Sequence, residues 1–368
     1  MRRHIFLAVL LLIGLVTAGC GDKGSDNPAP GLGPDGKLYV LNQADATIYI
    51  YDTETMEKIK TVETHIAKPH YIVFTPDKQF YYVMTVDFSS KIAKFDAATD
   101  AFITDFDLTA AAQAVFTNQR SVIPSGMCIT PDGQYGYMCD YTAGTERGHI
   151  YKVNLSTMAV EKKIQSGAQT HEILSTTDGK VVVACNLASE DITLIYTDED
   201  TVTFVPIDPN PAADPSTHHY GPYCVAVDHH LQKAYISCLY AHQIRILDIY
   251  SRQIIDSIEI PITQGIAVSG PAMIHHAHNG KYLFLTTKWG NSVVIVDLPQ
   301  RQVAAEIPIG TGHPFGIAMS DDDKRIYVAA SGQPPKHGYM YEIDVASLKV
   351  IDSIEVGLDS WGIGWKAD

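Results

Sequence analysis

The sequence predicts an all-β protein, a seven-bladed β-propeller of four-stranded antiparallel blades. One observation is an alternating strand, usually ending in Asp, that recurs seven times at intervals of roughly 42 to 58 residues, the length of one propeller blade. Another is the abundance of Tyr, Val, Ile, Asp and Gly without long helical patterns, which is typical of all-β proteins. The seven copies are 48–52, 92–96, 150–154, 192–196, 244–248, 293–297 and 340–344.

Each copy is expected to be the third strand of its blade. An inner strand that opens near Pro precedes it, as at 69–74, and a second strand follows the inner one, as at 79–84. The dipeptides at 132–133, 178–179 and 279–280 are Asp-Gly or Asn-Gly, which favour tight hairpin turns. An outer strand such as 253–260 would complete the blade.

The two ends of the predicted domain complete one blade. The first strand, at 37–40, corresponds to the second strand of a blade, and 360–365 is an inner strand with no blade after it. We therefore expect the C-terminal strand to join blade one and close the ring, which removes exposed sheet edges.

The first residues have the composition of an export signal. Arg2 and Arg3 form a basic start, and 5–16 is an apolar run too short to cross a bilayer. Thr17-Ala18-Gly19-Cys20 resembles a bacterial lipobox, in which the cysteine becomes the lipidated N-terminus. The alternative is an ordinary secretory signal with a chance cysteine.

The predicted organisation is a lipoprotein signal peptide at 1–19, a flexible tether at 20–36 and the propeller at 37–368. The tether is rich in Gly, Pro and small polar residues, which cannot bury a core. The sequence thus predicts a protein of the periplasm or cell surface, held to the membrane by a lipid on Cys20.

The net charge limits the partners. It is −15 for the whole chain, and removal of the two signal arginines brings it near −17. Such an acidic chain is not expected to bind nucleic acid or anionic membrane surfaces. Its expected partners are the membrane, through the N-terminal lipid, and an unidentified protein or small molecule.

A recurring tetrapeptide carries a family resemblance. Tyr39-Val40-Leu41-Asn42 is repeated in variant form at 82–85 and 327–330, and the chain from 37 to 368 resembles the YVTN β-propeller family. Proteins of this superfamily include surface-layer proteins, lactonase-like enzymes, the haem d1 domain of nitrite reductase and the copper-binding propeller of nitrous oxide reductase. The resemblance implies the fold, and the scaffold hosts unrelated activities.

Histidines are expected to gather on one face of the ring, termed the top face, where the inner strands begin. His70 and His171 follow the first position of their inner strands, and His313 precedes the corresponding proline. Imidazole suits copper, zinc and haem iron, so these three are candidate metal ligands. The alternative is that they are unrelated surface histidines.

Aromatic and cationic residues are also expected on the top face. Such rings with a few cations are typical of a small-molecule or peptide site, and the alternative is that they fill the channel as packing. The candidate ligand-binding residues are Arg120, Tyr223, Lys288, Trp289, Phe315 and Trp361. Glu172 is a weaker candidate partner of His171, because strand alternation would point it away.

The cysteines allow two interpretations. Cys128 could face Cys139 across one hairpin, and Cys224 could face Cys238 across another, giving two disulfides. Alternatively they are buried thiols of the core, as expected of Cys185.

The leading functional hypothesis is a non-enzymatic cell-envelope lipoprotein that binds a small ligand or partner protein on the top face. A metal- or haem-handling protein is the second hypothesis, and a lactonase-like hydrolase is the third. The sequence has no Gly-x-Ser-x-Gly motif, and no catalytic residue is predicted.

Overall fold

The computed structural model describes residues 36–142, 144, 146–208, 220–228, 232–262, 269–310, 312–332 and 334–368. These residues belong to one compact unit, Gly33–Asp368. The predicted signal peptide, Cys20 and nearly all of the tether lie outside the described residues. Within the described ranges, no helix has the length and apolarity needed to cross a bilayer.

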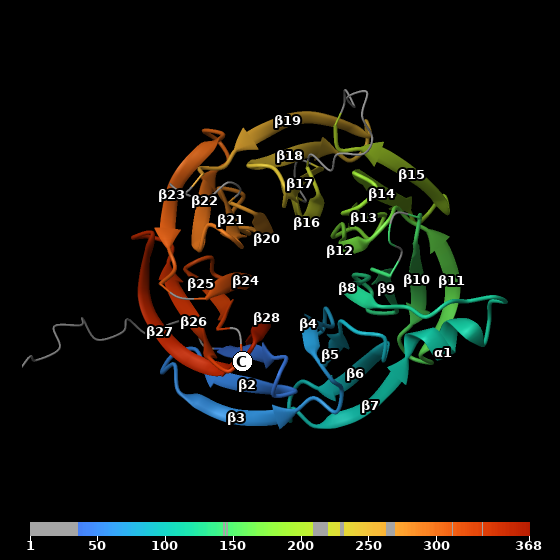
Figure 1. Ribbon diagram of the computed structural model, residues 1–368, viewed down its shortest axis with the longest axis horizontal. Coiled ribbons are helices and arrows are strands. Elements are labelled where there is room, and N and C mark those ends of the chain that lie inside the picture. The colour runs from blue at the N-terminus through green and yellow to red at the C-terminus, as the bar shows by residue number, and fades with distance from the viewer. Residues whose placement is uncertain are drawn as a thin grey trace, which may run out of the picture. The chain divides into compact units, whose positions relative to one another are not determined.

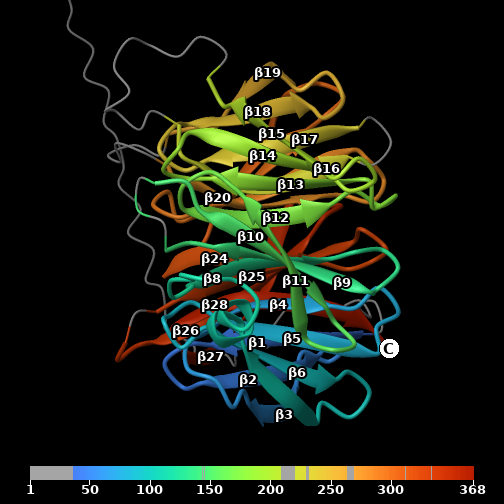
Figure 2. The ribbon, with the colours of Figure 1, turned by 90° about the vertical axis from the view of Figure 1, so that its right-hand side faces the viewer.

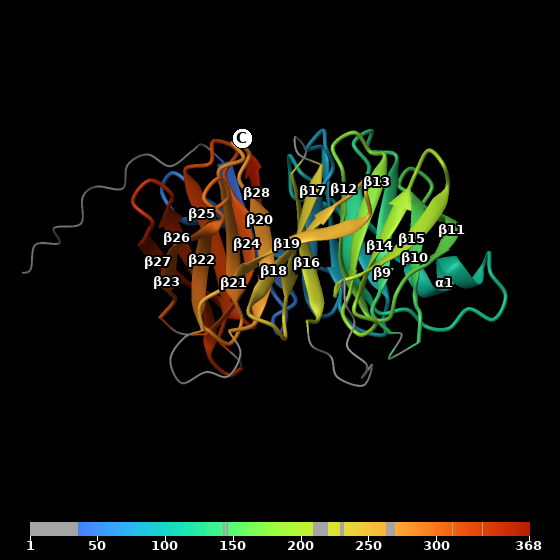
Figure 3. The same ribbon diagram turned by 90° about the horizontal axis from the view of Figure 1, so that it is seen from above.

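Seven four-stranded antiparallel sheets surround a central axis, and each forms one blade (Figure 1). Figures 2 and 3 show the same ring edge-on. The inner strands are β28 (Ser360–Ala367), β4 (Pro69–Phe74), β8 (Pro124–Ile129), β12 (Thr170–Ser175), β16 (Pro222–Asp228), β20 (Pro271–His276) and β24 (His313–Met319). The second strands are β1 (Gly36–Asn42), β5 (Phe80–Thr85), β9 (Tyr135–Asp140), β13 (Val181–Asn186), β17 (Lys233–Cys238), β21 (Tyr282–Thr287) and β25 (Arg325–Ser331).

The third strands coincide with the recurring sequence element, which confirms the blade prediction. They are β2 (Thr47–Asp52), β6 (Lys91–Asp96), β10 (His149–Asn154), β14 (Asp191–Tyr196), β18 (Gln243–Asp248), β22 (Ser292–Asp297) and β26 (His337–Asp344). The outer strands are β3 (Lys58–Glu63), β7 (Phe102–Asp107), β11 (Ala159–Gln165), β15 (Thr201–Pro206), β19 (Gln253–Glu259), β23 (Gln302–Pro308) and β27 (Lys349–Leu358). One short helix, α1 (Leu108–Gln113), follows β7, and its N-cap Asp107 accepts a hydrogen bond from the Ala110 amide.

The ring closes as the sequence predicts. β28 pairs antiparallel with β1, so that Trp365 lies opposite Leu38 and Ile363 opposite Val40. The C-terminal strand is therefore the inner strand of blade one. Because closure pairs this edge, neither end of the chain leaves an open blade.

The core lies between neighbouring blades. Every residue of β13 and β14 is buried, because a blade packs on a sheet at each face, whereas β3 on the outside is largely exposed. The tyrosines of the recurring tetrapeptide, Tyr39, Tyr82 and Tyr327, are also buried.

Every inner strand carries a β-bulge near its first residue. In β4 the register shifts between Pro69 and Tyr71, and in β12 it shifts between Thr170 and Glu172. The other five inner strands shift at the corresponding position. A bulge re-aims side chains, so two consecutive residues can face the same side of a strand.

The strand pairing makes the disulfide alternative wrong. Cys128 lies opposite Tyr137 rather than Cys139, and Cys224 lies opposite Ser237 rather than Cys238. The five cysteines of the described region are all free and buried, as the alternative of core thiols expects. They are Cys128, Cys139, Cys185, Cys224 and Cys238.

Candidate ligand-binding site at the central channel

The bulges arrange channel residues in two layers. The upper layer, here called the upper ring, consists of the residue after the first bulge position of each inner strand: Trp361, His70, Ser125, His171, Tyr223, Ala272 and Phe315. The next residues form the lower ring: Gly362, Tyr71, Gly126, Glu172, Cys224, Met273 and Gly316. The channel is therefore lined by pairs of consecutive residues, one pair from each blade.

The upper ring forms a packed aromatic cluster. The ring of Phe315 lies 4.4 Å from Trp361, 6.1 Å from Tyr223 and 6.4 Å from His171, measured between ring centroids. His70 lies 5.5 Å from Phe315 and 6.4 Å from His171. These rings meet from five blades and fill the top of the channel.

Both histidines of this cluster are electrostatically neutral at pH 7. Burial lowers the pKa of His70 to about 4, and the Lys288 ammonium adds to the effect. Burial likewise lowers the pKa of His171 to about 3, with a smaller contribution from His70. The pair therefore offers neutral ring nitrogens.

Lys288 lies over the cluster. Its Nζ is 5.5 Å from the ring centroid of Trp361 and 6.0 Å from that of Phe315. Burial lowers the pKa of Lys288. Asp359, the carboxylate next to the cluster, accepts hydrogen bonds from Trp361 Nε1 at 2.6 Å and from the Ser331 hydroxyl at 2.7 Å. Within the described ranges, no carboxylate forms an ion pair with Lys288.

The remaining predicted site residues have other neighbours. Arg120 forms an ion pair with Asp140 at 2.9 Å. Trp289 stacks on Tyr240, with ring centroids 6.3 Å apart. His313 Nδ1 lies 3.1 Å from the carbonyl oxygen of Lys288. The structure thus groups Tyr223, Lys288, Phe315 and Trp361 with His70 and His171, and it gives Arg120, Trp289 and His313 different contacts.

Chemically distinct side chains lie directly below, in the lower ring. Burial raises the pKa of Glu172 to about 7, although the Tyr71 hydroxyl, which donates a hydrogen bond to the carboxylate, opposes this. Burial also raises the pKa of the Cys224 thiol well above its usual value. A cavity of about 400 Å³ adjoins these residues and extends to the bottom turn at His278.

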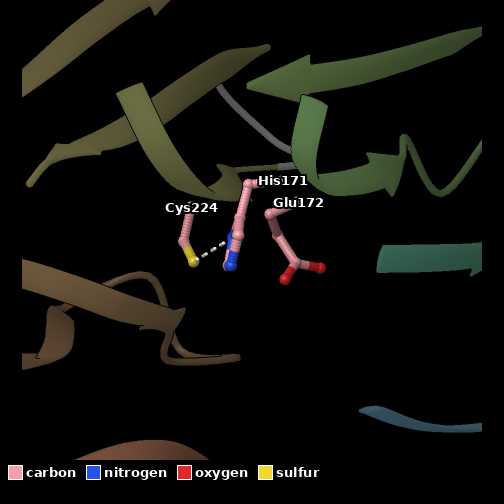
Figure 4. Close-up of side chains that lie close together, drawn as sticks. All are labelled: His171, Glu172 and Cys224. Atoms are coloured by element: carbon pink, nitrogen blue, oxygen red, sulfur yellow. Dashed lines mark hydrogen bonds between the residues drawn. The ribbon is translucent and has the colours of Figure 1, made fainter. Parts of the chain in front are cut away.

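Sequence reasoning missed the grouping of Glu172 with Cys224. One donor atom each of His171, Glu172 and Cys224 lie within 4.8 Å of one another (Figure 4). Simple strand alternation points Glu172 away from His171, but the bulge brings both side chains to one side. Position in the repeat could have indicated these residues, because Cys224 and Met273 each follow an upper-ring residue directly in the sequence.

The protein is a seven-bladed β-propeller whose ring is closed by β28, and its candidate site lies on the axis of the central channel. More specifically, the chain belongs to the family described as "Lactonase, 7-bladed beta-propeller", whose sequence model matches residues 38–355. No curated protein gives a significant match to the chain.

Solved structures with the same fold include enzymes of different chemistry. Hydrazine synthase from Kuenenia stuttgartiensis is 17% identical over 80% of this chain and 89% of that chain, with a TM-score of 0.64. A functionally unknown protein from Desulfotomaculum acetoxidans DSM 771 is 12% identical over 90% and 99%, with a TM-score of 0.68. Dihydro-haem d1 dehydrogenase NirN in complex with DHE is 10% identical over 92% and 77%, with a TM-score of 0.60. At these identities the likeness shows the fold alone.

Proposed function

We propose that this protein is a cell-envelope lipoprotein whose propeller binds a small anionic ligand on its top face without catalysing a reaction. The observation that carries the proposal is the position of Lys288 over the rings of Trp361 and Phe315. A ligand with a flat apolar body and a carboxylate or similar anion would match both the aromatic rings and the ammonium group.

The cation is the specific part of this site. Removing an ammonium group from water is unfavourable unless a counter-charge compensates, and the described neighbours of Lys288 are aromatic. An anionic ligand would supply the missing counter-charge in a half-buried setting, where electrostatic attraction exceeds that at an open surface. The neighbouring rings would supply apolar contact and a stacking surface.

The cell-envelope part of the proposal comes from the N-terminus. The basic start, the short apolar run and the small residues before Cys20 support export and lipidation. A protein tethered in this way would present the propeller to ligands of the periplasm or cell surface.

Lactone hydrolysis is the second candidate function, and family membership favours it. In that case Glu172 is the residue best suited to act as a general base, because its pKa of about 7 lies near neutral pH. Turnover of a simple lactone by the wild-type protein, lost in Glu172→Gln, would replace the binding hypothesis.

Paired probes test the binding proposal. Indole-3-acetate and indole-3-acetamide share the flat ring, and only the acid carries charge. We expect the acid to raise the melting temperature more than the amide, because a ligand bound only to the folded state stabilises it. Lys288→Gln should abolish the difference between the probes, whereas Lys324→Gln, in a bottom-face turn, should preserve it. Equal shifts with acid and amide in the wild-type protein would contradict an anion site.

A further inference from the structure

We propose that His171, Cys224 and Met273 form a binding site for a soft monovalent metal ion, copper(I), at the top of the channel cavity. This set differs from the three histidines expected from the sequence, since it contains a thiol, a thioether and one imidazole. It shares His171 with the upper ring, whereas its sulfur ligands Cys224 and Met273 lie in the lower ring, so substitutions at the two sulfur residues test it separately from the Lys288 site.

Cys224 lies at the centre of the set, close to a donor atom of each of the other two residues. Cys224 Sγ lies 3.9 Å from His171 Nδ1 and 3.2 Å from Met273 Sδ. An ion about 2.0 to 2.3 Å from nitrogen and sulfur ligands, the usual range for such bonds, fits between atoms at these separations. Figure 4 shows Cys224 and His171 directed toward each other, with Glu172 beside them.

Rigid elements hold the three ligands. His171 comes from β12, Cys224 from β16 and Met273 from β20, which are the inner strands of three consecutive blades. His171 is 5% exposed and Cys224 is 1% exposed. A site built on packed strands keeps its ligand geometry better than one built on loops.

The donor types select the metal. Thiolate and thioether sulfur are soft ligands that favour copper(I), and imidazole also suits copper. A zinc site would use His171, Cys224 and the carboxylate of Glu172 instead. That carboxylate accepts a hydrogen bond from the Tyr71 hydroxyl, whereas the thioether of Met273 accepts its hydrogen bond from the Cys224 thiol, whose proton copper(I) would replace. These contacts favour copper(I) over zinc.

The cavity gives the ion a route. Cys224 and Met273 line a space of about 400 Å³ that is also lined by His275 and His276, at the lower end of β20, and by His278 in the turn that follows. An ion entering from the bottom face would pass these imidazoles before it reaches the sulfur ligands. The aromatic upper ring closes the site from above.

The positive charge of the bound copper(I) is offset by the release of one proton. Copper(I) replaces the proton of the Cys224 thiol, which passes to solvent, so the net charge of the site is unchanged and no electron is transferred. His171 must present a lone pair at Nδ1, and its proton then resides on Nε2. The contact displaced is a long one, 3.3 Å from His171 Nδ1 to the carbonyl oxygen of Tyr223.

Competition with the copper(I) chelator bathocuproine disulfonate under anaerobic conditions tests the site in the purified full chain. We expect one copper(I) ion per chain, with X-ray absorption showing two sulfur ligands. Cys224→Ser and Met273→Leu should each weaken binding, Cys224→Ser by at least about 100-fold, because loss of a ligand exceeds the effect of losing an outer contact. Cys238→Ser and Met340→Leu make the same changes at buried residues outside the site and should bind as the wild type does.

Three results would overturn the assignment. They are failure of the wild-type chain to retain copper(I) against the chelator, equal loss of binding in the control variants, and zinc binding at Cys224 without copper(I) binding. Circular dichroism checks that each variant is folded, and Met273→Leu, a volume-conserving change, keeps the test valid if Cys224→Ser does not fold.

Discussion

The imidazole of His171 stacks on the ring of Tyr223, with centroids 3.6 Å apart and planes inclined by 21°. The two residues occupy the same bulge position on the neighbouring inner strands β12 and β16. Because burial lowers the pKa of His171 to about 3, the stacked imidazole is neutral at pH 7. This contact lies directly next to Glu172 and Cys224, the lower-ring residues that follow His171 and Tyr223 in the same two strands.

Replacing Tyr223 with Leu should destabilise the propeller. The change removes a buried aromatic ring and its stacking contact with His171, which should lower the free energy of unfolding by about 2 kcal/mol. Urea denaturation at pH 7 measures the difference. Tyr250→Leu makes the same change at a tyrosine that is 46% exposed and should have a much smaller effect. Equal losses in the two variants would contradict a packed upper ring.

Glu172→Gln should change the pH dependence of stability. Burial raises the pKa of Glu172 to about 7 in the folded protein, from its ordinary value of 4.5. The folded state therefore holds this proton more tightly, and its stabilising contribution is complete below pH 4.5 and is lost as the pH rises through 7. Glutamine cannot ionise, so the variant should gain about 3 kcal/mol relative to wild type between pH 4.5 and pH 8.

Unfolding curves at the two pH values check this prediction. Glu63→Gln, at an exposed position of β3, is the matched control and should follow the wild type. A difference between Glu172→Gln and wild type that stays constant across this range would show that Glu172 is not a buried carboxyl of raised pKa.

Deleting residues 360–368 should prevent stable folding. The deletion removes β28, exposes the edge of β1 and eliminates Trp361 and Trp365 from the core. Loss of these contacts would amount to several kcal/mol, comparable with the whole stability of a typical domain. Thermal unfolding of the truncated chain, compared with a chain lacking Asp368 alone, measures the effect. A truncated protein that melts with the control would refute ring closure as a requirement for stability.

Cys20→Ser should release the protein from membranes or leave it unprocessed. A lipid chain contributes roughly 0.8 kcal/mol for each buried CH₂ group, and several chains together make retention stable. Fractionation of cells followed by immunodetection measures the distribution. Ser25→Cys added to the Cys20→Ser chain should not restore attachment, because the position after the small residues is required. An unchanged membrane fraction for Cys20→Ser would rule out the lipid anchor.

The fold was predictable from the sequence because a blade repeats a local pattern. Each alternating third strand, such as 293–297, carries the same apolar period, and 360–365 is identifiable as an inner strand without a blade. Closure then follows from the need to pair sheet edges. The aromatic part of the site was also visible, because Tyr223, Phe315 and Trp361 share one position in the repeat.

The lower ring was not predictable, because a bulge depends on the pairing of two strands rather than on one strand's pattern. Period-two alternation separates Glu172 from His171, whereas the bulge of β12 brings both to the channel. The expected pairing of Cys224 with Cys238 is also replaced, by a pairing of Cys224 with Ser237. Glycines offered an unused clue. A Cβ on Gly126 would lie 2.7 Å from the His171 carbonyl oxygen, so glycine here allows neighbouring inner strands to approach closely.

Comparative dialysis tests the proposed function most directly. Wild-type and Lys288→Gln proteins are each equilibrated against a small-molecule extract of the producing cells, and the retained compounds are identified by mass spectrometry. The upper ring with Lys288 predicts an anionic compound bearing a flat apolar group that the wild type retains and the variant does not. Retention of the same compounds by both proteins, or of none by either, would contradict an anion-binding site on the top face.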